Sequence, residues 1–335
     1  MGEQGAGHAV PEQTVVQGCM GLGGGWEGDG YGAAEVDQAR AVVEAALAAG
    51  ITWFDHADIY ASGRAEAVFG ELLAEDPGLR SRVRLQTKCG VRLPGDGSTG
   101  LPAPIRGAGS GVGRYDLSPA HVRASVEGSL RRLRTDHVEL LLLHRPDPLA
   151  DLPALAAELE ALHAEGLVGA VGVSNVGAAQ VTALQAHLAL PVVANQLEMG
   201  LHHRGFAEAG VLVGDADQAP LVGFPLGTLE HHAAHGVRLQ AWRPLAQGRY
   251  TGAARTPADR AVQDLVAALA ERHGTTPEAV LLWWLRHHPA DVVPVIGTSS
   301  PARIAACADA VATRSRLTDD EWYALWVAAR GAPLP

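Results

Sequence analysis

The chain has few cysteines, little charge and no long hydrophobic run. Its three cysteines, Cys19, Cys89 and Cys307, are an odd number and lie far apart. This pattern favours free thiols over a disulfide framework or a zinc site. No run of about 18 apolar residues is present, so we expect no membrane-spanning helix. Residues 1–13 lack the basic region and apolar core of a signal peptide, and we therefore expect a soluble, cytoplasmic protein.

Composition restricts the class of partner. Hydrophobic residues make up 47% of the 335 residues and charged residues 19%, which is ample for a large buried core. The length suits a single α/β barrel. The formal net charge of −11 argues against nucleic acid or an anionic membrane as the main partner. We expect a small-molecule partner, with a monomer as the favoured assembly.

Short β-rich runs alternate with longer segments of helical period. The expected strands are Thr14–Met20, Thr52–Asp55, Val83–Lys88, Val138–His144, Gly169–Ser174, Val192–Gln196, Val237–Trp242 and Val292–Ile296. The expected helices are Glu35–Ala49, Arg64–Ala74, Pro119–Arg132, Leu152–Glu165, Ala178–His187, Thr228–His235, Ala258–Arg272, Pro277–Arg286 and Pro301–Ala310. Eight strands in alternation with helices predict a (β/α)8 TIM barrel.

Two further observations favour this α/β barrel over a doubly wound sheet. Apolar runs such as Leu140–Leu143 are typical of strands buried on both faces of a parallel sheet. A doubly wound sheet would place a glycine-rich phosphate turn at the start of its first helix. The glycine-rich segment Gly21–Gly25 lies about ten residues before the helix near Glu35. We expect a flexible N-terminus, residues 1–13, followed by one barrel domain, residues 14–330.

Two long segments interrupt the alternation. Val91–Leu117 is rich in Gly and Pro, and Met199–Gly227 follows the sixth expected strand. Loops of this length are usually either functional or disordered. Because both follow strands, we expect them at the carboxyl-end face, as a lid or a pocket wall.

Three successive strands are expected to end in polar residues. Asp55 ends the second strand, and Tyr60 follows five residues later. The next strand ends in Lys88 and the one after it in His144. Because the carboxyl ends of parallel barrel strands open onto one mouth, these four side chains are predicted to form a catalytic site.

The four side chains suit the activation of a carbonyl group. A tyrosine is a weak acid, with a pKa of about 10, and we expect Lys88 to lower the pKa of Tyr60 so that it serves as a general acid. Asp55 would hold the Lys88 ammonium, and His144 would donate a hydrogen bond to the substrate oxygen. The set contains no hydride source, so a cofactor must supply the reductant.

From about Thr14 to Trp326 the chain resembles the aldo-keto reductases. The segment DHADIYASGRAEAVFGELL, the strand-end Lys88 and the strand-end His144 match the catalytic tetrad of that family. The motifs HADIY, KCG and HRPDP resemble a bacterial subgroup of oxidoreductases. The resemblance implies reversible reduction of an aldehyde or ketone to an alcohol by NAD(P)H, with the proton coming from Tyr60.

The resemblance also implies a set of cofactor-binding residues. Ser174, Asn175 and Gln196 are similar to groups that bind the nicotinamide carboxamide, and Trp242 to the ring that stacks on the nicotinamide. Gly24 lies in the glycine-rich turn. The pyrophosphate strap is represented by Pro244, Leu245, Gln247 and Gly248, with Arg243 directly before them. The adenosine phosphate clasp is represented by Ile296, Gly297, Thr298, Ser299 and Arg303.

Several positions depart from the family pattern. Gly297 stands where many members have Lys, and Ala306 and Cys307 replace a Glu-Asn pair that often holds adenine. Arg303 still favours NADPH through its 2′-phosphate, but NADH remains a possible second cofactor. Arg243 replaces a common small residue, and either contacts a phosphate or is a surface arginine.

The substrate and the rival functions remain open at this point. Trp26, His202 and Tyr115 are candidate substrate-binding residues. Sugar-derived aldehydes, small α-dicarbonyls, steroid-like ketones and pyridoxal are all candidate substrates. One rival function is a catalytically weak NADPH-binding regulatory subunit of another protein. The other is a metal-dependent barrel hydrolase that would use His231, His232 and His235; we expect no metal site.

Overall fold

A computed structural model describes residues 13–26, 30–93, 113–215, 217–218 and 222–334. Nearly all of the N-terminal segment that was expected to be flexible lies outside these ranges. The middle of the first long loop, residues 94–112, lies outside them too.

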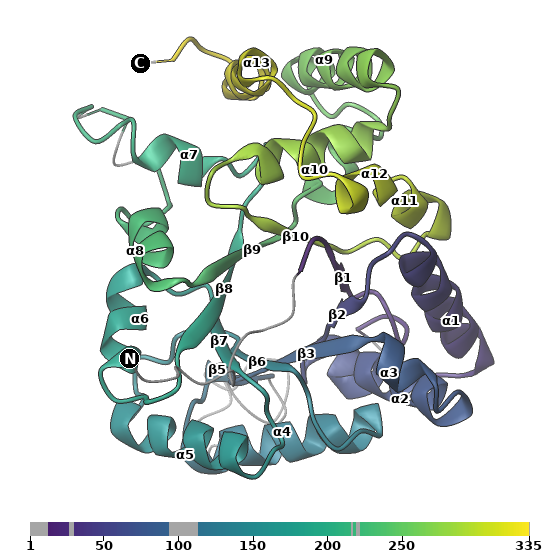
Figure 1. Cartoon of the computed structure of the whole chain (residues 1–335), viewed down its shortest axis with the longest axis vertical. Helices are drawn as coiled ribbons and strands as arrows, with labels where there is room; N and C mark the ends of the chain where they lie inside the picture. Colours follow the sequence, from purple (N-terminus) through teal and green to yellow (C-terminus); the bar gives the residue numbers. More distant parts are fainter. Residues whose placement is uncertain (1–12, 27–29, 94–112, 216, 219–221, 335) are drawn as a thin grey trace, which may run out of the picture. The chain divides into compact units, whose positions relative to one another are not determined.

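Eight strands form a closed barrel in the order β1-β10-β9-β8-β7-β6-β3-β2 (Figure 1). They are β1 (Val16–Gly18), β2 (Trp53–Asp55), β3 (Arg84–Cys89), β6 (Leu140–Leu143), β7 (Val171–Ser174), β8 (Val192–Glu198), β9 (Arg238–Trp242) and β10 (Val293–Ile296). Neighbouring strands such as β3 and β6, or β9 and β10, pair in parallel. The predicted (β/α)8 barrel and its eight strands are therefore confirmed.

Most helices lie where the periodicity placed them. These are α1 (Ala33–Ala48), α2 (Arg64–Glu75), α4 (Pro119–Leu133), α5 (Leu152–Ala164), α6 (Ala178–Gln185), α8 (Thr228–His235), α9 (Pro257–His273) and α10 (Pro277–His287). The expected helix Pro301–Ala310 is wrong in one respect, because it is two short helices, α11 (Pro301–Ala305) and α12 (Ala308–Ala312).

Other elements were not expected. They are α3 (Leu79–Arg82), α7 (Gly205–Ala209), α13 (Asp319–Arg330) and a two-stranded antiparallel ribbon of β4 (Val91–Arg92) and β5 (Arg114–Tyr115). Helix α13 begins at a capping box: Thr318 Oγ1 accepts from the Glu321 N–H at 3.2 Å, and Glu321 Oε2 accepts from the Thr318 N–H at 2.9 Å. It follows the last strand, outside the strand–helix alternation.

The chain divides into two compact units. The first comprises residues 1–11, 19–39 and 54–195, and the second comprises residues 12–18, 40–53 and 196–335. Divisions fall inside α1, β2 and β8. All four predicted catalytic residues belong to the first unit.

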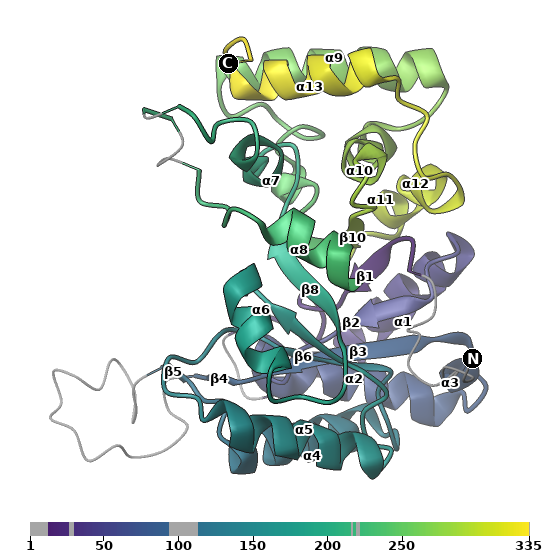
Figure 2. The ribbon, with the colours of Figure 1, turned by 60° about the vertical axis from the view of Figure 1, so that its left-hand side comes forward.

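In the first unit, helices α2 and α4 pack closely. In Figures 1 and 2, α4 and α5 lie side by side along the same unit. Gly70 of α2 faces the carboxyl end of α4, where a Cβ atom at this position would lie 2.0 Å from the Arg132 carbonyl oxygen. Only glycine allows this approach without a backbone shift.

In the second unit, tryptophans form part of the core between α10 and α13. Trp284 and Trp322 stack with ring centroids 5.1 Å apart. Each indole N–H donates to the backbone carbonyl of the other residue, at 3.1 and 2.8 Å. Trp283 and Trp326 are also buried.

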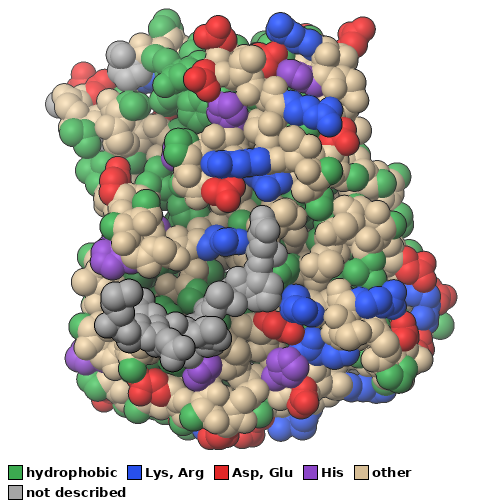
Figure 3. Space-filling view, viewed as in Figure 1, with side chains coloured by type: hydrophobic (Ala, Val, Ile, Leu, Met, Phe, Trp, Pro, Cys, Tyr) green, Lys and Arg blue, Asp and Glu red, His purple; other side chains and the backbone are tan. Residues whose placement is uncertain are grey.

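The remaining composition-based expectations can be compared with the structure. The three cysteines are free thiols, as expected, and all three are buried. No helix within the described part of the chain is long and apolar enough to span a membrane. On the face seen in Figure 3, acidic and basic side chains are interspersed with other residues.

Replacing Gly70 by alanine should destabilise the protein, because the new methyl group collides with the Arg132 carbonyl. We expect a loss of about 1–3 kcal/mol in the free energy of unfolding, measured by urea denaturation. Gly210→Ala is the matched control, since a Cβ there has no neighbour within 4 Å and the backbone is helical. Equal stability of the two variants would contradict this packing account.

Candidate active site

The centre of the site is a buried ammonium group. Lys88 Nζ donates to Asp55 Oδ2 at 2.6 Å, to the His56 carbonyl at 2.9 Å and to Tyr60 Oη at 3.0 Å. Lys88 and Asp55 are only 1% and 3% exposed. The three donated bonds match the three protons of an ammonium group. The structure therefore brings Asp55, Tyr60 and Lys88 together as predicted.

Sequence reasoning missed two partners in this cluster. Gln86 Nε2 donates to Asp55 Oδ1 at 2.6 Å, so both carboxylate oxygens of Asp55 have a partner. Gln86 lies two residues before Lys88 on β3, and the period-two rule for strands places both side chains on one face. The His56 carbonyl carried no signal in the sequence, because any residue has one.

A strained turn positions Tyr60. The 3-10 helix η1 (Tyr60–Gly63) contains Ala61 and Ser62 with φ angles of 47° and 57°. Left-handed non-glycine residues cost roughly 1–3 kcal/mol each and cluster at functional sites. Arg64 secures the end of the turn by donating to the carbonyls of Gly23 and Gly25, at 3.1 and 2.5 Å.

The protonation states of Tyr60 and Lys88 follow from burial and from each other. Burial raises the pKa of Tyr60 more than the Lys88 charge lowers it, so the net pKa lies above 10.0. The expected net lowering of this pKa is therefore wrong, although Lys88 acts in the expected direction. Burial alone lowers the pKa of Lys88, but Asp55 and Tyr60 reverse this and raise it. At neutral pH the pair is a phenol beside an ammonium group.

His144 follows β6 and lies beside the phenol. Its ring is edge-on to that of Tyr60, with centroids 6.0 Å apart. Burial, and then the charges of Lys88 and Arg145, lower the pKa of His144 to about 3. The ring is therefore neutral at pH 7 and carries one N–H donor. The structure thus brings the fourth predicted catalytic residue to the other three.

The residues after β7 are tied to His144. Ser174 is buried, and its Oγ accepts from Asn175 Nδ2 at 2.8 Å. The same Asn175 amide group donates to the His144 carbonyl at 3.2 Å. Asn175 has a φ of 59°, which asparagine tolerates better than most residues. This contact orders the segment that was predicted to hold a carboxamide.

Two further acidic side chains, Asp58 and Glu66, lie close to the turn that carries Tyr60. The Asp58 N–H donates to the Lys88 carbonyl at 3.0 Å. Burial and the nearby Glu66 raise the pKa of Asp58 to about 7. Glu66 is fully buried and accepts from Arg132 Nε at 2.8 Å and from Thr87 Oγ1 at 2.6 Å. Asp58 therefore changes charge near neutral pH directly beside β3, the strand that carries Lys88.

In the second unit, the last residue of β9, Trp242, is the predicted stacking ring, and the predicted strap follows it. The guanidinium of Arg243 lies 5.3 Å from the Trp242 ring centroid and 3.3 Å from Glu198 Oε1. Residues Pro244 and Leu245 lead into the 3-10 helix η4 (Ala246–Gly248). Within it Gln247 and Gly248 have left-handed φ angles of 56° and 77°. Arg243 thus has an acidic partner within the protein.

The predicted phosphate clasp follows β10, whose last residue, Ile296, is fully buried. Arg303 is partly exposed, donates to Thr251 Oγ1 at 2.9 Å and lies 3.7 Å from Glu278. Its Nη2 would be 2.9 Å from a Cβ on Gly248, so strap and clasp adjoin. A Cβ on Gly297 would meet no atom within 4 Å. With the hydroxyls of Thr298 and Ser299, this donor set suits the phosphates of a dinucleotide.

The predicted substrate and glycine-turn residues remain predictions. Trp26 and Tyr115 are 51% and 46% exposed. His202 Nδ1 lies 3.4 Å from Tyr250 Oη, and burial lowers its pKa. Gly24 has a φ of 84°, and a Cβ there would lie 3.7 Å from the Glu35 side chain.

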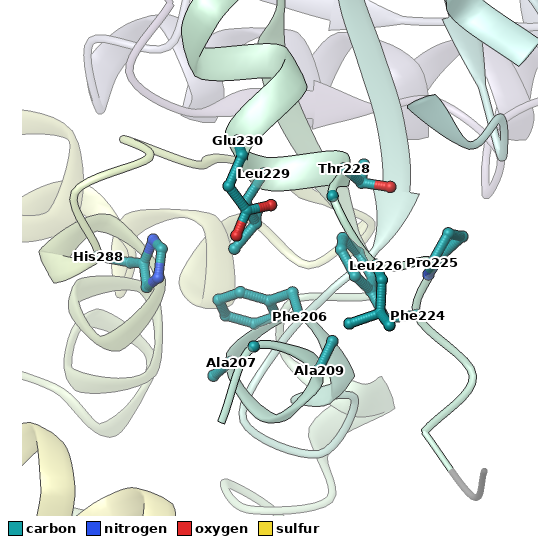
Figure 4. Close-up of a pocket in the computed structure, with 12 residues that line it drawn as sticks. Phe206, Ala207, Ala209, Phe224, Pro225, Leu226, Thr228, Leu229, Glu230 and His288 are labelled. Carbon is teal, nitrogen blue, oxygen red and sulfur yellow. The ribbon is translucent and has the colours of Figure 1, made fainter. Parts of the chain in front are cut away.

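A separate apolar pocket of about 160 Å³ lies in the second unit, between α7, α8 and the end of α10. Figure 4 shows Phe206 and Leu229 on either side of it, with His288 at one edge. None of the candidate substrate or cofactor residues lines this pocket.

Helix α8 carries three histidines, His231, His232 and His235. His231 and His235 stack with centroids 4.2 Å apart. Within the described ranges, no group of three or more His, Cys, Asp or Glu side chains is arranged to hold a metal.

Comparison with protein families gives a match over nearly the whole chain. The model of the Aldo/keto reductase family matches residues 14–326. A 6-dehydroglucose reductase of Agrobacterium fabrum is 37% identical over 292 residues, which cover 87% of this chain and 88% of that protein. A second 6-dehydroglucose reductase, from Novosphingobium aromaticivorans, is 36% identical over 318 residues, or 93% and 92% of the two chains.

Comparison with solved structures also gives matches over nearly the whole chain. A glycerol dehydrogenase from Gluconobacter oxydans superimposes with a TM-score of 0.76 at 26% identity, covering 96% of this chain and 93% of that one. An aldo/keto reductase from Klebsiella pneumoniae in complex with NADP and acetate gives a TM-score of 0.66 at 26% identity, covering 96% and 92%.

Lys88→Met should destabilise the protein strongly, because it leaves the buried Asp55 carboxylate without its cation. We expect a loss of about 3–5 kcal/mol in urea unfolding, partly restored by adding Asp55→Asn. Arg82→Met is the control, since it breaks the exposed Arg82–Asp76 pair of 2.7 Å and should cost at most about 1 kcal/mol. The account is contradicted if Lys88→Met costs no more than Arg82→Met.

Asp58 should make folding stability depend on pH. Its folded pKa of about 7 exceeds the ordinary 3.8, so the folded protein binds this proton more tightly than the unfolded chain does. The stability that this bound proton contributes is fully present below the ordinary pKa of 3.8, and it is lost as the pH rises from there through about 7. Asp58→Asn should therefore gain stability relative to wild type between about pH 4 and about pH 8 in thermal unfolding.

Asp37→Asn, at an exposed position of α1, is the control for the Asp58 measurement. If both variants follow the wild-type pH dependence, Asp58 does not titrate in this range.

Proposed function

The chain belongs to the aldo/keto reductase family, and on that premise we propose that it reduces an aldehyde or ketone to an alcohol, reversibly, with NADPH or NADH as reductant. The observation that carries this proposal is the Tyr60 hydroxyl, 3.0 Å from a buried ammonium group and edge-on to a neutral histidine. This arrangement offers a proton donor beside a positive charge and a second hydrogen-bond donor.

The cofactor, when bound in reduced form, would supply a hydride to the carbonyl carbon. Tyr60 would donate its proton to the carbonyl oxygen, and the resulting phenolate would be stabilised by Lys88, 3.0 Å away. The raised pKa of Tyr60 does not prevent this transfer. The product alcohol is a much weaker acid than a phenol, so Tyr60 remains the stronger acid of the two.

His144 would orient the substrate oxygen. Because its pKa is lowered to about 3, the ring is neutral at working pH and donates one N–H without competing as a charged acid. The tie from Asn175 to the His144 carbonyl fixes the backbone that carries the ring.

The residues predicted to bind the nicotinamide and those predicted to bind phosphate would hold the cofactor. Ser174, Asn175 and Gln196 would bind the nicotinamide carboxamide, and Trp242 would stack on its ring. Arg303, with Thr298 and Ser299 nearby in sequence, would bind phosphate and favour NADPH. Glu278, 3.7 Å from Arg303, weakens this preference, so NADH remains a second cofactor. The NADP-bound Klebsiella relative supports a phosphorylated nicotinamide cofactor.

We further propose a sugar-derived aldehyde as the substrate. Two relatives that match 87% and 93% of this chain are named 6-dehydroglucose reductases. The three free thiols suit a reducing cytoplasm, where such a reaction would draw on NADPH.

Consumption of NADPH or NADH, followed at about 340 nm over a panel of aldehydes and ketones that includes 6-dehydroglucose, tests the proposed function. We expect turnover with at least one carbonyl class, and faster turnover with NADPH. Tight cofactor binding with no turnover on any carbonyl would overturn the enzymatic proposal and favour a regulatory subunit.

Tyr60→Phe should remove the proton donor and leave the ring in place. We expect kcat to fall by about 10²–10⁴, with cofactor binding unchanged. Tyr323→Phe, on the exposed face of α13, is the control and should keep wild-type activity. Near-native carbonyl reduction by Tyr60→Phe would show that another group supplies the proton.

A further inference from the structure

Three buried glutamines form a chain of hydrogen bonds in the second unit. Gln13, Gln240 and Gln196 are 4%, 0% and 2% exposed. Gln240 Nε2 donates to Gln13 Oε1 at 2.9 Å, and Gln196 Nε2 donates to Gln240 Oε1, also at 2.9 Å. The hydrogen bonds therefore run in one direction, from Gln196 on β8 through Gln240 on β9 to Gln13, three residues before β1.

This direction determines how the Gln196 amide is turned. The oxygen and the NH₂ group of a glutamine amide are nearly equal in size, so their hydrogen-bond partners decide which way the amide points. Gln240 presents an oxygen to Gln196 because its own NH₂ group is taken by Gln13. Gln196 must then point its Nε2 at Gln240, which directs its Oε1 the other way. An amide oxygen has two lone pairs and can accept from a ligand besides its protein partners.

Resting on the proposed function, we propose that Gln240, backed by Gln13, is a positioning residue that holds Gln196 with its oxygen presented to the N–H of the nicotinamide carboxamide. A carboxamide NH₂ group is a donor and needs an acceptor. With the amide reversed, Gln196 would present its own N–H groups, and two donors would face each other. The three hydrogen-bonded glutamines thus favour a nicotinamide ring that carries a carboxamide over an analogue that carries a ketone.

Gln240→Met tests this by removing the acceptor for Gln196 while keeping a side chain of similar length. Affinities are measured by quenching of tryptophan fluorescence, with NADPH and with its reduced 3-acetylpyridine analogue, in which a methyl ketone without N–H replaces the carboxamide. We expect the Kd for NADPH to rise about tenfold, as for one lost hydrogen bond. The Kd for the analogue should change less than about twofold, since it never made that bond.

Two further variants keep the test decisive. Gln240→Glu retains an oxygen for Gln196 and should bind NADPH within about threefold of wild type. Gln13→Met breaks only the outer bond, and serves if Gln240→Met does not fold; it should weaken NADPH binding more than analogue binding. Equal losses for the two cofactors, or no loss with NADPH, would overturn the inference alone. A wild-type protein that binds neither dinucleotide would overturn the proposed function as well.

Discussion

The site depends on one buried ammonium group. Lys88 is the only lysine in the chain, and every other basic side chain except the histidines is an arginine. A guanidinium is planar and always charged, whereas an ammonium is a compact charge with three donors. The three acceptors around Lys88, on Asp55, His56 and Tyr60, match this compact shape. Arginine serves elsewhere in the chain, but not at this position.

Much of the surrounding structure holds that ammonium and its partners in place. Gln86 occupies the second oxygen of Asp55, which fixes the carboxylate. The left-handed residues after Tyr60 are strained, and Arg64 holds the end of their turn. Burial strengthens the interaction between Lys88 and Asp55 because it removes competing water. The same burial keeps Tyr60 protonated and His144 neutral, which is the state that a proton donor and a hydrogen-bond donor require.

The sequence allowed two features to be predicted: the barrel, and the meeting of Asp55, Tyr60, Lys88 and His144 in one place. Both follow from periodicity and from polar residues at strand ends. Gln86 was within reach of the same reasoning, since it lies two residues before Lys88 on one strand face. The net pKa of Tyr60 was predicted wrongly, because burial is set by the tertiary structure and not by spacing. The break between α11 and α12 and the left-handed turn at Ala61 are also set by tertiary packing, against local propensity.

Because the chain has a single lysine, labelling lysine with ¹³C at Cε gives one side-chain NMR signal that needs no assignment. A titration of that signal measures directly whether Lys88 is charged. We expect an ammonium shift throughout neutral pH, with no titration below the ordinary lysine value of about 10.4. A midpoint below about pH 8 would show a neutral amine at the centre of the site, and would contradict the account.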